Sequence, residues 1–72
     1  MDVYLTEREK NVLFYLVKGY TNEEIAKVLH ISVHTVKAHL EAIYEELRVG
    51  NRVQAAMKAV SLELVGLETF VK

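Results

Sequence analysis

Two capping boxes fix where the first two helices of this chain begin. Thr6 is followed three residues later by Glu9, and Thr21 is followed three residues later by Glu24. In a capping box the threonine hydroxyl accepts a hydrogen bond from the backbone N–H at the third helical position, and the glutamate carboxylate accepts one from the N–H of the threonine. Apolar residues recur at helical spacing after each box. The sequence therefore predicts two short helices with well-defined starts.

Two further N-caps and three glycines complete an all-α prediction. Ser32 and Asn51 are favourable N-cap residues. The first, third and fourth helices are expected to end at Gly19, Gly50 and Gly66. No proline interrupts the chain. We expect a single domain over residues 1–72, with helices at about residues 6–18, 22–29, 33–48 and 52–65.

The connection between the second and third predicted helices is very short, since only "LHIS" (residues 29–32) joins them. Two helices joined so tightly cross at a steep angle, as in a helix-turn-helix. His30 falls where the backbone is expected to need a positive φ, which histidine tolerates better than most residues.

The third predicted helix has one narrow apolar stripe. An α-helix turns by about 100° per residue, which places three apolar residues within about 40° of Val36. These residues are Leu40, Ile43 and Leu47. The stripe must face the core. The opposite side carries His34, Ala38, Glu41 and Glu45, flanked by Lys37 and Arg48. A small residue at the centre of a polar face allows close approach to a flat partner, although a merely solvated face shows the same pattern.

The fourth predicted helix has apolar residues on two sides. The expected core stripe is Val53, Met57, Val60 and Leu64. A second stripe, nearly opposite, contains Ala55, Ala59 and Leu62. Its small residues favour close contact between the fourth helices of two copies of the chain. The high helix propensity of alanine is the alternative explanation.

Charge and composition narrow the function classes. Nine basic and ten acidic residues give a formal net charge of −1, so a nucleic-acid partner would require basic groups to gather on one face. The absence of cysteine excludes disulfides and thiolate metal sites. No apolar run approaches the roughly 18 residues of a membrane span.

The polar residues show no metal or catalytic pattern. His30 and His34 are close in sequence but lie across a helix boundary, and no third ligand accompanies them, whereas zinc needs three or four ligands. The carboxylates are spread along predicted exposed faces, and no nucleophile has a base at suitable spacing. We expect no metal, no cofactor and no enzymatic activity.

Several blocks of the sequence resemble the LuxR-type (GerE-like) helix-turn-helix domain. They are "LTEREKNVL", "GYTNEEIAKVL", "ISVHTVKAH" and "LRVGNR", followed by an alanine-rich helix. The blocks occur in the family's order and spacing over nearly the whole chain, which is a more specific signal than one short motif. The resemblance implies a bacterial transcription regulator, or its C-terminal output domain, that binds double-stranded DNA.

The resemblance makes the third predicted helix the recognition helix. It implies that Lys37 contacts base edges or phosphates, and that Ala38 makes an apolar contact with a base, such as a thymine methyl group. Thr35 is expected near a phosphate at the helix N-terminus. Arg52 is expected to make either a phosphate contact or an ion pair at the edge of the core. The predicted DNA-contacting residues are Thr21, Ser32, His34, Thr35, Lys37, Ala38, Glu41, Arg48 and Arg52.

Glutamates replace residues that are often basic in relatives, at Glu23, Glu41 and Glu46. Each lost basic contact weakens the sequence-independent attraction to DNA. Glu41 is open to two interpretations. Its carboxylate accepts a hydrogen bond from the N4 amine of a cytosine, or it forms an intrahelical pair with Lys37. Glu45 and Glu46 are expected to be solvated or to pair with Arg48 and Arg52.

We therefore predict a sequence-specific DNA-binding domain that acts as a homodimer through its fourth helix, with half-sites roughly 10 bp apart. Other expected partners are an upstream sensor or receiver domain and RNA polymerase. The expected location is the bacterial cytoplasm, at the nucleoid when the protein is bound to DNA. Two alternatives stay open: a protein-interaction module that has lost DNA affinity through its glutamates, or a domain that binds DNA only when a sensor domain or a partner supplies avidity.

Overall fold

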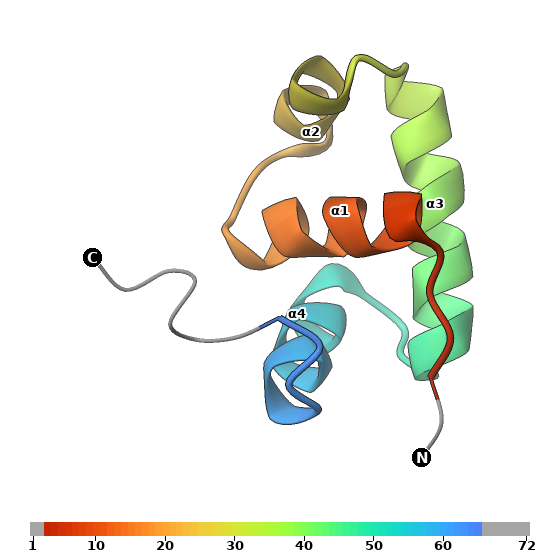
Figure 1. Ribbon diagram of the computed structural model, residues 1–72, viewed down its shortest axis with the longest axis vertical. Helices are drawn as coiled ribbons and strands as arrows, with labels where there is room; N and C mark the ends of the chain where they lie inside the picture. Colours follow the sequence, from red (N-terminus) through yellow and green to blue (C-terminus); the bar gives the residue numbers. More distant parts are fainter. Residues whose placement is uncertain (1–2, 66–72) are drawn as a thin grey trace.

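Helices make up the regular structure of the part of the chain that is described, residues 3–65 of a computed structural model. They are α1 (Glu7–Val17), α2 (Asn22–Leu29), α3 (Val33–Leu47) and α4 (Arg52–Ser61). Figure 1 shows α3 running along the domain, with α1 crossing it and with α2 and α4 on either side of α1. No strand occurs among residues 3–65, which confirms the all-α prediction. Within the same range, no helix has the length and apolar character needed to cross a membrane.

Both capping boxes are formed. The Thr6 hydroxyl accepts from the Glu9 N–H at 3.1 Å, and the Glu9 carboxylate accepts from the Thr6 N–H at 3.0 Å. Thr21 and Glu24 repeat the pattern at 3.1 and 2.8 Å. At the other two helix starts, Ser32 accepts from the Thr35 N–H and Asn51 accepts from the Gln54 N–H. Local hydrogen bonds therefore define every helix start as predicted.

The four helices end in one shared geometry. A left-handed residue follows each helix, and these residues are Gly19 (φ 93°), His30 (φ 58°), Arg48 (φ 59°) and Glu63 (φ 59°). The next residue then donates its N–H to a carbonyl in the last turn, as Ile31 does to Ala26 at 3.0 Å and Leu64 does to Ala59 at 2.8 Å. This arrangement is the Schellman motif, which satisfies carbonyls that the helix itself leaves free. The predicted positive φ at His30 is confirmed.

Two helix ends differ from the prediction because the left-handed residue is not a glycine. The third helix ends at Leu47, since Arg48 and not Gly50 takes the left-handed conformation. The prediction that the fourth helix extends to residue 65 is wrong. That helix ends at Ser61, and Glu63 is left-handed. Gly66, the expected stop, lies outside the described residues.

The apolar stripe of α3 forms the centre of the core. Val36, Ile43 and Leu47 have no exposed surface and Leu40 is 4% exposed, which confirms the predicted inward face. Each of the other three helices contacts α3. They contribute Val12, Leu13, Leu16, Ile25, Ala26, Ala55 and Ala59 to the same buried cluster. One face of α3 is thus covered by protein along its whole length.

The predicted faces of α4 are reversed. Ala55 and Ala59, expected on an outward stripe, are fully buried, whereas Val53 and Met57, expected in the core, are 66% and 68% exposed. Burying the larger side chains would remove more apolar surface from water. However, α4 packs against both α1 and α3, and small residues allow helices to approach more closely. The alanine face therefore lies in the core.

Arg52 helps to set this rotation of α4. One guanidinium nitrogen donates to the Asn22 side-chain oxygen at 3.0 Å, and the other donates to the Tyr20 carbonyl. Residues three, four and seven positions along a helix share a face, so this anchor turns Ala55 and Ala59 inward. Both acceptors of Arg52 are neutral oxygens. Within residues 3–65, Arg52 has no acidic partner, so the predicted ion pair is not formed there.

Replacing the left-handed His30 with glycine should stabilise the domain. Glycine adopts a positive φ without the steric penalty that other residues incur, so the free energy of unfolding of His30→Gly should rise by up to about 1 kcal/mol. Lys27→Gly is the control, because residue 27 lies within α2, and this substitution should lower the free energy of unfolding by about 1 kcal/mol. Urea denaturation measures both. Equal destabilisation by the two glycines would contradict the assigned backbone conformation.

Removing the Arg52 side chain should destabilise the domain by about 1–3 kcal/mol, because it removes two charge-assisted hydrogen bonds, one to the α1–α2 connection at Tyr20 and one to the start of α2 at Asn22. Asn22→Ala removes one of these acceptors and should have a smaller effect. In the double variant, Asn22→Ala should add little to Arg52→Ala, because the two side chains share one interaction. Fully additive losses in chemical denaturation would show that the two side chains act independently.

Candidate nucleic-acid interface

The face of α3 that points away from the core is a continuous exposed surface. His34, Lys37, Ala38 and Glu41 are all exposed, and they lie opposite the buried Val36 stripe as the helical periodicity predicts. Ala38 sits at the centre of this surface, where its short side chain lets a partner approach the helix backbone. We call these four residues the outward face of α3.

The start of α3 leaves backbone N–H groups available next to the outward face. Ser32 caps the helix, accepting from the Thr35 N–H at 3.0 Å, and its hydroxyl lies 2.9 Å from the Thr35 hydroxyl. The first turn of α3 contains no acidic residue. No acidic side chain of this first turn therefore neutralises the partial positive charge at the start of α3, which suits a phosphate.

The start of α2, unlike that of α3, carries acidic side chains. Its first turn contains Glu23 and Glu24, and Thr21 is occupied in its capping box with Glu24. The Thr21 hydroxyl accepts from a backbone N–H, which leaves its own proton free to be donated. This helix start is therefore less favourable for an anion than the start of α3.

The predicted DNA-contacting residues do not form one cluster. Ser32, His34, Thr35, Lys37, Ala38 and Glu41 lie together on the N-terminal half of α3. Arg48 is exposed, but it follows the last turn of α3, roughly 16 Å along the helix axis from Lys37 at 1.5 Å per residue. Arg52 is held by hydrogen bonds to Tyr20 and Asn22, so its predicted phosphate contact has no support from the geometry.

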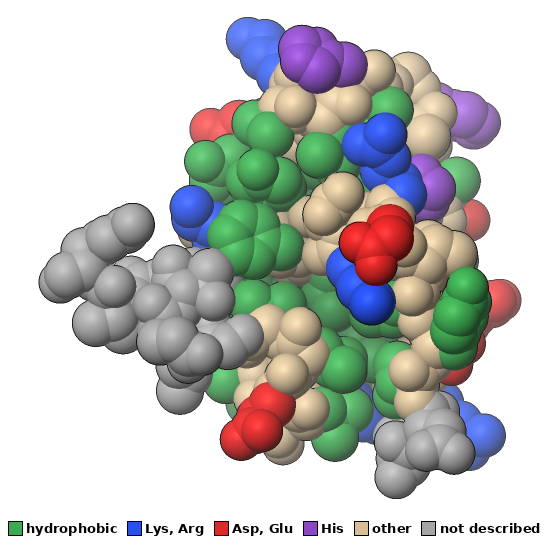
Figure 2. All heavy atoms as spheres, viewed as in Figure 1, with side chains coloured by type: hydrophobic (Ala, Val, Ile, Leu, Met, Phe, Trp, Pro, Cys, Tyr) green, Lys and Arg blue, Asp and Glu red, His purple; other side chains and the backbone are tan. Residues whose placement is uncertain are grey.

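Basic groups gather where α2 meets α3. Figure 2 shows histidine and Lys or Arg side chains together over this end of the domain. Arg8 of α1 was not identified from the sequence, and its guanidinium donates to the Leu29 carbonyl at the end of α2 at 3.5 Å. No local motif predicts this contact, because it joins residues 21 positions apart. Although the net charge of the chain is near zero, the end of the domain where α2 meets α3 is therefore more basic than the rest.

Glu46 does not belong to the outward face. Its carboxylate accepts a hydrogen bond from the Tyr4 backbone N–H at 2.9 Å, and the side chain is half-buried. The expectation that Glu46 is solvated or paired with an arginine is wrong. Its partner is the extended segment before α1, and a contact 42 positions away in sequence gives no local signal.

Glu41 and Lys37 are both unpaired within residues 3–65. The intrahelical pair between them is not formed, and the ion pair that the described residues show is between Lys10 and Glu7 at 3.4 Å. The outward face therefore carries one positive and one negative side chain that are free to meet a partner.

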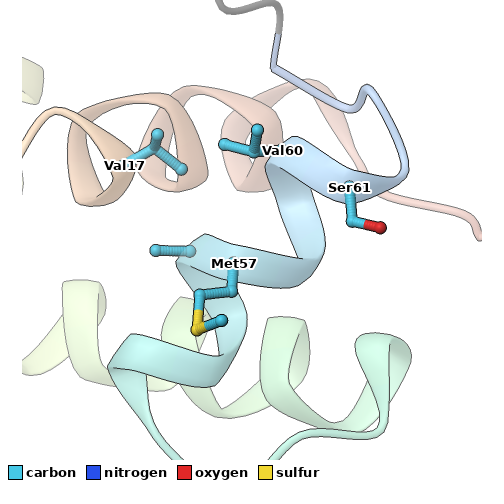
Figure 3. A pocket seen from close by; sticks show the side chains of 5 residues that line it. Val17, Met57, Val60 and Ser61 are labelled. Carbon is cyan, nitrogen blue, oxygen red and sulfur yellow. The ribbon is translucent and has the colours of Figure 1, made fainter.

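A second exposed surface lies on α4. Val53 and Met57 are exposed, and Met57 borders an apolar groove with Val17, Ala56, Val60 and Ser61. Figure 3 shows Val17 of α1 and Val60 of α4 on the two sides of this groove. The predicted contact stripe of Ala55 and Ala59 is wrong, because both are buried within the chain itself, while Leu62 is 37% exposed and follows the end of α4.

The comparisons with known proteins agree with this geometry. Residues 3–59 match the family model described as "Bacterial regulatory proteins, luxR family". The chain is 44% identical over 61 residues to the response regulator protein VraR of Staphylococcus aureus (strain NCTC 8325 / PS 47), a match that covers 85% of this chain and 29% of VraR. The chain thus spans less than a third of that relative. The family is one of transcription regulators and not of enzymes.

Two solved structures extend the likeness to three dimensions. The transcription factor GerE superposes with a TM-score of 0.80 and 33% identity, covering 88% of this chain and 94% of GerE. The DNA-binding domain of the response regulator ComA, solved with the anti-activator RapF, gives a TM-score of 0.76 and 41% identity, covering 78% of this chain and 97% of that domain. The family match over residues 3–59 and the similarity to these two structures show that the chain belongs to the luxR family of bacterial regulatory proteins.

Proposed function

We propose that the 72 residues act as one domain that binds double-stranded DNA sequence-specifically, with α3 in the major groove. The observation that carries this proposal is the outward face of α3, where a small residue and a free lysine stand exposed along a helix whose other face is buried. A helix-turn-helix places the N-terminal part of its second helix against base edges. The outward face occupies that part of α3.

The groups on and around the outward face of α3 each have a role in the proposed contact with DNA. The start of α3, with the Ser32 and Thr35 hydroxyls, holds a backbone phosphate. Lys37 donates to a guanine or to a phosphate, and Ala38 contacts a thymine methyl group. Thr21 donates its hydroxyl proton to a second phosphate at the start of α2. Glu46 is engaged inside the domain and does not repel the duplex at close range.

Two copies of the domain pair through the exposed apolar side of α4. Val53 and Met57 are the most exposed large apolar residues of that helix, and the groove between Val17 and Val60 lies next to Met57. Burying these side chains against their symmetry mates removes apolar surface from water on both copies. The dimer places two α3 helices on half-sites about 10 bp apart.

The domain serves as the output part of a transcription regulator in the bacterial cytoplasm. VraR is a response regulator, and the chain matches 29% of its length. A receiver or sensor domain that controls the pairing of two copies would supply the regulatory input, and RNA polymerase is the expected partner of the DNA-bound form.

The first test is duplex binding at increasing salt concentration. The affinity of the wild-type protein should fall steeply with salt, because binding releases counterions from the DNA. Lys37→Ala should weaken specific binding by about 1–3 kcal/mol. Lys10→Ala removes an equal charge from α1, where the lysine pairs with Glu7, and should leave the affinity nearly unchanged. Equal losses in the two variants, measured by fluorescence anisotropy, would exclude α3 as the reading helix.

The second test concerns the dimer. Met57→Asp places a charge in the proposed interface and should raise the dimer dissociation constant by about tenfold or more, measured by analytical ultracentrifugation. Val28→Asp is the control, because Val28 is an exposed valine near the end of α2, and α1 lies between α2 and α4 (Figure 1). If Met57→Asp and the wild-type protein associate equally, then α4 is not the interface.

A further inference from the structure

We infer that Glu41 reads a cytosine in the major groove and so fixes the base at one position of the DNA site. This inference rests on the proposed function, because it requires α3 to lie in the groove. The sequence leaves Glu41 open to two interpretations, an intrahelical partner of Lys37 or a base contact, and the structure distinguishes them.

The structure removes the intrahelical interpretation. Within residues 3–65, Glu41 has no hydrogen bond or ion pair, and neither has Lys37. Two other carboxylates on these helices do have partners, since Glu24 caps α2 and Glu46 accepts from the Tyr4 N–H, whereas Glu23 and Glu45 are exposed like Glu41. Glu41 is therefore an exposed acid that makes no side-chain interaction within the described residues.

Its position is that of a base-reading residue. Glu41 lies one helical turn after Lys37 on the outward face, about 6 Å further along the axis at 1.5 Å per residue. Successive base pairs are about 3.4 Å apart. The two side chains therefore reach base pairs within about two steps of each other, and the short Ala38 side chain between them does not block the approach of the helix.

The choice of cytosine follows from the groups that the major groove presents. An ionised carboxylate only accepts hydrogen bonds. Guanine presents only acceptors there and thymine an acceptor and a methyl group, so both repel or exclude it. Adenine presents a donor beside the N7 acceptor, whereas cytosine presents the N4 amine alone. Cytosine is thus the base that matches Glu41, as guanine matches the neighbouring Lys37.

A charged carboxylate also rejects the other bases. Next to a duplex, an unpaired glutamate faces the phosphates and a largely acceptor-lined groove, and both are repulsive. Discrimination therefore comes from the penalty at a wrong base as well as from the contact at the right one. A glutamate on a DNA-binding face therefore lowers the affinity for all duplexes and raises the preference for duplexes that carry the matching base.

The experiment is an in vitro selection of duplexes from a random pool, with sequencing of the bound fraction, at one fixed salt concentration. The proteins are the wild type, Glu41→Gln, Glu41→Ala and Glu45→Gln. Glu45 provides the matched control, because it is an exposed glutamate one turn further along the same side of α3. Circular dichroism confirms that each variant is folded before the selection.

The wild type should select cytosine at one position of each half-site. Glu41→Gln should lower the preference for cytosine there by roughly 5- to 150-fold and favour adenine, which a glutamine contacts through N6 and N7. Glu41→Ala should lose the preference without gaining adenine. Glu45→Gln should select the wild-type sequence with an affinity that changes equally for all duplexes.

Two outcomes overturn the inference and leave the proposed function intact. In the first, both Glu41 variants select the wild-type bases at every position. In the second, Glu45→Gln alters the same base position as Glu41→Gln, which would show an effect of charge alone. A wild-type protein that enriches no duplex at all would instead overturn the proposed function, and the inference with it.

Discussion

The burial of one face of α3 is the constraint on which the rest of the structure depends. Val36, Leu40, Ile43 and Leu47 are covered by the three other helices. Because a helix has a fixed angular period, burying these residues determines which side chains point the opposite way. The core thus sets the direction of Lys37, Ala38 and Glu41 without touching them, and the identities of these three residues are free of packing requirements.

Much of the fold follows from local signals in the sequence. The capping boxes at Thr6 and Thr21 and the N-caps Ser32 and Asn51 are short-range hydrogen-bond patterns, and all four form as predicted. The inward stripe of α3 follows from periodicity alone. The helix-turn-helix could be recognised because one short connection limits how two helices cross.

The parts that could not be predicted depend on long-range geometry. The rotation of α4 is set by the hydrogen bonds of Arg52 to Tyr20 and Asn22 and by the close approach that Ala55 and Ala59 allow. The hydrophobicity of Val53 and Met57 points to the opposite rotation. Similarly, Glu46 and Glu41 are both glutamates of α3. Only the hydrogen bond from the Tyr4 N–H shows that Glu46 has a structural role, whereas Glu41 is exposed.

The Schellman endings have a consequence for redesign of the domain. Three of the four left-handed positions, His30, Arg48 and Glu63, carry side chains where glycine would be less strained. Arg48 and Glu63 lie beyond the ends of α3 and α4, far from the outward face. Glycine at Glu63, which is not a predicted DNA-contacting residue, should therefore raise thermal stability without altering target choice, whereas at His30 the same change would remove an imidazole from the corner where α2 meets α3.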